Sequence, residues 1–77
     1  MSKLPVIKAT RLEKLILHLG FVLQRQKGSH IFYRHPDGRT TSIPHHPGKD
    51  LPRELTRTIL RQINLSIEEF LELYNKV

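Results

Sequence analysis

Apolar positions spaced three and four residues apart mark the first element of the chain. Leucine or isoleucine recurs at i, i+3, i+4 and i+7 from Leu12 to Leu19, which is the pattern of one buried helix face. Thr10 and Glu13 have the spacing of a capping box, in which each side chain bonds the backbone N–H of the other residue, so the helix is predicted to begin there. Gly20 is predicted to end it, because glycine readily adopts the conformation that follows a last helical turn.

Three short runs of β-forming residues follow the first helix. Lys27-Gly28 separates the first run from the second, and the turn sequence Pro36-Asp37-Gly38 separates the second from the third. Pro44 has no backbone N–H to donate, so it is predicted to end the third strand. The predicted strands are residues 21–26, 30–35 and 39–43.

Side chains of the middle strand alternate between two faces. Each face includes an apolar residue, so the pattern leaves open which face the helices cover. One face carries His30, Phe32 and Arg34, and the other carries Ile31, Tyr33 and His35.

Two more helical patterns complete the chain. Asp50 is a predicted cap with Pro52 in the first turn, and Asn64 is predicted to end this helix in the left-handed conformation. Ser66 and Glu69 have the spacing of a second capping box, which predicts a short final helix. The stripes expected to be buried are Leu55, Ile59, Leu60 and Ile63 in the first of these helices and Ile67, Phe70, Leu71 and Tyr74 in the second.

The order of elements, α-β-β-β-α(-α), predicts an α+β fold with a three-stranded antiparallel sheet and helices packed on one face. A length of 77 residues suits one domain, expected to span residues 1–77. No apolar run approaches the roughly 20 residues that cross a bilayer, and no signal peptide is recognisable. No membrane association is therefore expected, and the cytoplasm is the expected compartment.

The charge of the chain is unevenly distributed. Residues 1–49 carry nine Lys and Arg against two Asp and Glu, a net charge of +7, whereas residues 50–77 carry four against five, a net charge of −1. A basic N-terminal part favours a polyanionic partner such as RNA, although simple solubility is the alternative explanation. The chain has no cysteine, which excludes disulfides and thiolate chemistry.

Histidine is the residue type in this chain that is best suited to catalysis or metal binding. The spacing of the five histidines does not favour a metal site, since His45 and His46 are adjacent and would point apart. Ser29 next to His30 would also diverge from it, which argues against a hydrolase triad. Acid–base cleavage of RNA fits better, because histidine titrates near neutral pH and cationic neighbours can hold the phosphate. Those neighbours are Arg25, Lys27 and Arg34.

Four ordered segments resemble a known family. They are Gly28-Ser29-His30 with Phe32-Tyr33, then His35-Pro36-Asp37-Gly38-Arg39, then Pro44-x-His46-Pro47-Gly48-Lys49, and finally a closing stretch from Ile59 to Phe70. Together, over roughly residues 10–73, they resemble the HicA toxins, the RNA-cleaving halves of type II HicA–HicB toxin–antitoxin systems, also described as YcfA-like.

The resemblance implies a fold like that of the double-stranded-RNA-binding domain and a ribosome-independent mRNA interferase that needs no metal or other cofactor. It implies that His30 is catalytic and that a HicB-type antitoxin binds the toxin and covers this histidine. Ile31 departs from the family, in which many members have a second histidine or another polar residue at this position. The candidate RNA-binding residues are Lys27, Gly28, Ser29, Arg34, His46 and Lys49.

Several alternatives remain open from the sequence. The second group in the acid–base reaction is not identified: His46 or a lysine is a candidate, as is His30 acting alone, and a loop-bracing role is the preferred one for His46. His18 is interpreted as a surface residue near a helix C-terminus. A non-catalytic double-stranded-RNA-binding module would show the same basic surface. A third hypothesis is that this surface mainly binds the antitoxin and that RNA shares it.

Overall fold

The computed structural model describes residues 4–45 and 48–77, which form a three-stranded sheet, a small two-stranded sheet and three helices. This is the predicted α+β architecture, and it is compatible with a fold like that of the double-stranded-RNA-binding domain. The elements are, in chain order, β1 (Ile7–Lys8), α1 (Ala9–His18), β2 (Val22–Lys27), β3 (His30–Arg34), β4 (Thr40–Pro44), β5 (Asp50–Leu51), α2 (Arg53–Gln62) and α3 (Ile67–Lys76).

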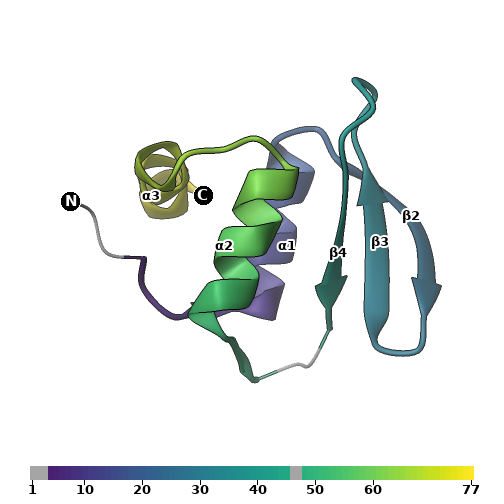
Figure 1. The fold of residues 1–77 in the computed structure, drawn as a ribbon, viewed down its shortest axis with the longest axis horizontal. Coiled ribbons are helices and arrows are strands. Elements are labelled where there is room, and N and C mark those ends of the chain that lie inside the picture. The colour runs from purple at the N-terminus through teal and green to yellow at the C-terminus, as the bar shows by residue number, and fades with distance from the viewer. Residues whose placement is uncertain (1–3, 46–47) are drawn as a thin grey trace.

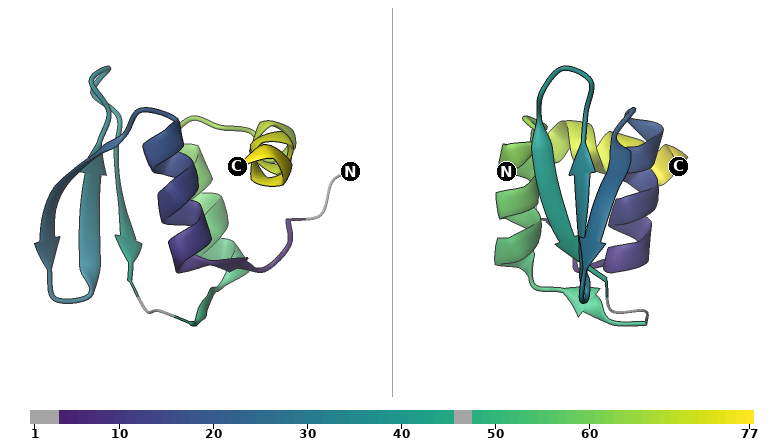
Figure 2. Two further views of the ribbon diagram at one scale, coloured as in Figure 1. Left: turned by 180° about the vertical axis from the view of Figure 1, so that it is seen from behind. Right: turned by 90° about the vertical axis from the view of Figure 1, so that its right-hand side faces the viewer.

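The main sheet is an antiparallel meander in the order β2-β3-β4. Helices α1 and α2 both lie on one side of this sheet, and α3 lies beyond them, on the side away from the strands (Figure 1). β4 is the strand nearest the helices and β2 is the furthest from them, so every residue of β2 is exposed. In the right-hand view of Figure 2 the strands lie in front and the helices lie behind them, so no helix of the described residues covers the near face of the sheet. The prediction of helices on one face is therefore confirmed.

The core lies between the sheet and the helices, and its residues show which face of β3 the helices cover. Ile31 and Tyr33 of β3 are buried, whereas His30 and Arg34 are exposed on the opposite face. The predicted stripes of the helices supply most of the remaining core, which includes Leu12, Leu15, Ile16, Ile43, Ile59, Leu60, Ile63 and Phe70.

The predicted ends of the last two helices are correct. Asn64 has a φ of 58°, the left-handed conformation expected after α2. At the start of α3, the Ser66 hydroxyl accepts the Glu69 N–H and the Glu69 carboxylate accepts the Ser66 N–H, both at 3.1 Å. This is the predicted capping box.

Two predicted helix starts are wrong. α1 begins at Ala9 after Lys8, without a side-chain cap, so Thr10 lies inside the helix and makes no capping box with Glu13. Glu13 instead turns inward and is buried. Asp50 does not cap α2 either, because it pairs with Lys8 in the small β1–β5 sheet and Pro52 occupies the cap position.

Several strand ends shift by one residue from the prediction. β3 stops at Arg34, so His35 belongs to the turn that follows. That turn begins with a hydrogen bond from the Gly38 N–H to the His35 carbonyl at 2.9 Å. β4 extends through Pro44, which pairs with His30 and is the last residue of the strand.

Candidate active site

A two-residue turn fixes the position of His30. Lys27 and His30 are paired across the β2–β3 hairpin, with Gly28 and Ser29 as the loop between them. Gly28 has a φ of 60°, and glycine at the first central position is the requirement of a type II′ turn, which matches the twist of the flanking strands. His30 is therefore held at the first position of a strand, with an exposed side chain.

The register of the sheet surrounds His30 with positive charge. Residues directly opposite each other in an antiparallel pair share a face, with Cβ atoms about 4.5–5.5 Å apart. Lys27 lies opposite His30, and Arg25 lies opposite Phe32 one step further along the same face. The Arg25 guanidinium covers the Phe32 ring at 4.6 Å from its centroid. Near His30, the open face of the sheet thus presents an imidazole, two cations and an aromatic ring.

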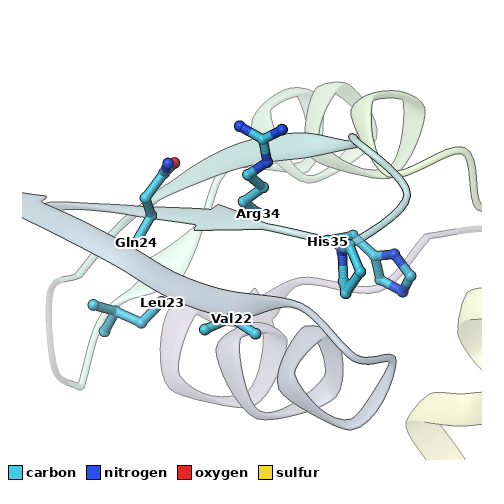
Figure 3. Close-up of a pocket in the computed structure, with 6 residues that line it drawn as sticks. Val22, Leu23, Gln24, Arg34 and His35 are labelled. Carbon is cyan, nitrogen blue, oxygen red and sulfur yellow. The ribbon is translucent and has the colours of Figure 1, made fainter.

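Arg34 shares this face but lies at the other end of β3. Arg34 is four residue steps along the strand from His30, or about 13 Å at the usual rise. It lines a shallow hollow beside Val22, Leu23 and Gln24, in which Gln24 and Arg34 point to one side of the sheet and Leu23 to the other (Figure 3). Arg34 therefore lies too far along β3 to belong to the immediate surroundings of His30.

A hydrogen-bond network on the helix side of the sheet joins the buried residues Glu13 and Tyr33 to the partly buried His45. Glu13 accepts a hydrogen bond from the Tyr33 hydroxyl at 3.0 Å and another from Nδ1 of His45 at 2.8 Å. The backbone N–H of His45 donates to the Ser29 carbonyl, next to His30. The sequence pattern does not predict this network, because the spacing of Glu13 from Thr10 indicates a helix cap and nothing in the pattern gives His45 a role.

Tyr33 carries the clearest electrostatic signature of this network. Burial raises the pKa of its hydroxyl well above the usual tyrosine value, and the hydrogen bond to the Glu13 carboxylate and the negative charge of that group raise it further. Tyr33 therefore remains a neutral donor at any pH near neutrality.

A second histidine, His35, has a bracing role at the other end of the sheet. Its Nδ1 accepts the Asp37 N–H at 3.1 Å, so Nε2 carries the proton that is donated to the Leu19 carbonyl, also at 3.1 Å. Arg39 is held in the same turn by the Asp37 carboxylate and by the Ile63 carbonyl. The backbone N–H of Arg39 donates a hydrogen bond to the Asp37 carboxylate, and this bond is the main reason that the pKa of Asp37 lies below its usual value. Through these contacts His35 and Arg39 stabilise the fold.

The remaining candidate residues are dispersed. Lys49 is exposed just before β5, and Ser29 is partly buried in the hairpin turn. His18 is exposed at the end of α1, as expected. His46 lies outside the described residues. Within residues 4–45 and 48–77, no three His, Cys, Asp or Glu side chains are grouped closely enough to hold a metal ion.

Comparison with protein families gives one result. The family model described as the HicA toxin of bacterial toxin-antitoxin systems matches residues 9–65. The chain belongs to the HicA toxin family. No curated protein sequence matches the chain.

The HicA match runs from the start of α1 to the residue before the Ser66 cap. It therefore includes the hairpin that carries His30 and the whole main sheet, and it leaves α3 outside. Membership of the HicA family implies an antitoxin partner. None of the helices described for this HicA toxin is long and apolar enough to cross a membrane.

Proposed function

We propose that this HicA toxin is a ribosome-independent endoribonuclease that cleaves mRNA without a metal ion or other cofactor, and that His30 is its catalytic residue. In this reaction the ribose 2′-oxygen attacks the adjacent phosphorus, its proton passes to a base, and the leaving 5′-oxygen receives a proton. The products are a 2′,3′-cyclic phosphate and a free 5′-hydroxyl. The observation that carries the proposal is the exposed imidazole of His30 on the cationic face of the sheet.

Each neighbour of His30 has a role in this proposal. Lys27, directly across the hairpin, neutralises the scissile phosphate and stabilises its developing charge. Arg25 over Phe32 offers a flat cationic surface on which a base can stack. Arg34 and Lys49 bind phosphates further along the RNA, and the Gly28–Ser29 turn borders the reacting group.

The first experiment compares the wild type with His30→Ala and with His18→Ala, a control that removes an exposed histidine from the end of α1. Purified proteins are incubated with RNA in EDTA, and the ends of the products are analysed. His30→Ala should reduce cleavage by about 10²–10⁴-fold, the usual contribution of general acid–base catalysis, whereas His18→Ala should cleave like the wild type.

Two outcomes would contradict the proposal. A folded His30→Ala variant that cleaves at the wild-type rate would exclude His30 as the catalytic residue. A wild-type protein that binds RNA and leaves it intact would favour a non-catalytic RNA-binding module, the second candidate function, which the cationic and aromatic open face of the sheet also supports.

The antitoxin is proposed to be of the HicB type and to neutralise the toxin by occupying the same face. A partner that covers Lys27, Arg25 and His30 needs acidic groups that complement them, which is also what the RNA phosphates provide. Antitoxin and RNA would then compete for one surface.

A further inference from the structure

Glu13 is a buried carboxylate whose two oxygens both have partners. It lies in the middle of α1 with only 9% of its surface exposed. One oxygen accepts the Tyr33 hydroxyl and the other accepts Nδ1 of His45. A carboxylate that is removed from water needs such partners, because burying it unpaired would be costly. The His45 ring is therefore held in one orientation by a group that is itself fixed in the core.

His45 connects this fixed point to the turn that carries His30. Its N–H bonds the Ser29 carbonyl, which makes Ser29 and His45 a hydrogen-bonded pair at the end of the β3–β4 ladder. Bonded and non-bonded pairs alternate along an antiparallel ladder, so the neighbouring pair, His30 and Pro44, is non-bonded. Proline is tolerated at position 44 because a residue of a non-bonded pair donates no N–H to the partner strand, here β3.

The side chains of His45 and His30 belong to opposite faces. Pro44 shares the open face with His30, and the next residue, His45, turns its ring toward Glu13 on the helix side. His45 therefore reaches His30 only through the backbone, along the path from Glu13 to the His45 ring, to the His45 N–H and to the Ser29 carbonyl.

We propose that the Glu13–His45 pair is a positioning unit that fixes the Ser29 carbonyl and thereby aligns His30 for cleavage. This inference rests on the proposed nuclease function. His45 is a positioning residue and exchanges no proton with the RNA. The pair is absent from the sequence-based hypotheses, in which His46 or a lysine is the second functional group.

The test uses two substitutions at position 45. His45→Ala removes the bond to Glu13. His45→Asn keeps it, because the asparagine amide nitrogen is attached to Cγ, as Nδ1 is in histidine, yet asparagine cannot exchange a proton near neutral pH. Cleavage is measured at saturating RNA under single-turnover conditions across a range of pH.

His45→Ala should slow single-turnover cleavage about 10- to 100-fold, the scale expected for a misplacement of about 1 Å, with little change in RNA affinity. His45→Asn should restore most of the rate and keep the shape of the wild-type pH profile. If His45→Asn is as slow as His45→Ala, or loses one limb of the pH profile, His45 takes part in proton transfer and the positioning role is wrong.

Tyr33→Phe is the matched control for general stability. It removes the other hydrogen bond to Glu13 and leaves the His45 bond in place. At a temperature at which both variants are folded, Tyr33→Phe should cleave at the wild-type rate. Slow cleavage by Tyr33→Phe, equal to that of His45→Ala, would mean that the rate follows stability, which overturns the proposal. His45→Ser, whose side chain is too short to reach Glu13, replaces His45→Ala if the latter does not fold.

A readout without RNA separates this inference from the nuclease proposal. Amide hydrogen exchange at residue 45 and the NMR shifts of Ser29 and His30 report the alignment of the turn directly. In His45→Ala the residue 45 amide should exchange faster, and the Ser29 and His30 signals should move; in His45→Asn they should stay near wild type. Unchanged exchange and shifts in His45→Ala would refute the positioning role even if the wild type cleaves RNA. A wild type that leaves RNA intact would refute the nuclease alone.

Discussion

Removing the Tyr33 hydroxyl should produce a stability loss with a distinctive dependence on pH. Tyr33 is 2% exposed, and its hydroxyl donates to the Glu13 carboxylate at 3.0 Å. Tyr33→Phe keeps the ring in the core and deletes only the donor. Glu13 then retains His45 as its single partner among the described side chains.

The magnitude follows from the charge of the acceptor. Hydrogen bonds to charged groups contribute about 1.5–3 kcal/mol, so Tyr33→Phe should cost about 2 kcal/mol at pH 7. For a domain of 60–100 residues, a loss of 1 kcal/mol in the free energy of unfolding lowers the Tm by about 4–8 °C. The Tm of Tyr33→Phe should therefore fall by about 8–16 °C.

The difference between the two proteins should shrink in alkali. Burial, the hydrogen bond to Glu13 and the charge of Glu13 raise the pKa of Tyr33 in the folded state above that of the unfolded chain. The stability that Tyr33 provides is fully present below the unfolded pKa of about 10 and is lost as pH rises beyond it, because only the unfolded state then loses its proton. The cost of Tyr33→Phe should therefore fall from about 2 kcal/mol at pH 7 to about 1 kcal/mol at pH 10.5.

Urea denaturation of both proteins at pH 7 and at pH 10.5 measures this difference, and other titrating groups cancel between them. Tyr74→Phe is the control, because the Tyr74 hydroxyl has no hydrogen-bond partner among the described residues while its ring packs against Phe70. A cost of Tyr33→Phe below about 0.5 kcal/mol at pH 7 would contradict the magnitude assigned to a charged acceptor. A cost that is the same at both pH values would contradict the raised pKa.

Two further predictions concern local geometry. Ser66→Ala should destabilise the protein by about 1 kcal/mol in urea denaturation through loss of the α3 cap. In the same variant the pKa of Glu69, which the backbone N–H and hydroxyl of Ser66 hold below its usual value, should rise in an NMR titration; an unchanged pKa would exclude the hydroxyl as a cause. Gly28→Ala should cost about 1–2 kcal/mol because of the positive φ at this position, with no steric contribution, since nothing lies within 4 Å of the added carbon. Ser29→Ala in the same turn should stay near wild type, and equal stability of the two turn variants would argue against backbone strain.

Much of the fold follows from local patterns in the sequence. The spacing of Leu12, Leu15 and Ile16 predicts α1, and the alternation through β3 predicts its two faces. The Gly28 turn and the Ser66 cap need only neighbouring residues, so both could be predicted. The exposed position of His30 also follows, once Ile31 and Tyr33 are known to face the helices.

Features that depend on distant residues could not be predicted in this way. Glu13 looked like a capping residue because its spacing from Thr10 is local, whereas its partners Tyr33 and His45 are 20 and 32 positions away. The small sheet joins Ile7–Lys8 to Asp50–Leu51, two pairs too short to show any periodicity. Tertiary packing decides both.

Strand β2 has a consequence for the behaviour of the chain at high concentration. It forms one border of the main sheet, with two large apolar side chains exposed near its start, Val22 and Leu23. An edge strand of this kind has unpaired backbone N–H and C=O groups, with which the edge strand of a second copy can pair to form fibrils. The register of β2 is interrupted between Leu23 and Arg25, and Arg25 and Lys27 follow the interruption, so a second copy would meet a broken ladder and like charges. Arg25 and Lys27, which we propose bind RNA, therefore also help to prevent the β2 strands of separate molecules from pairing.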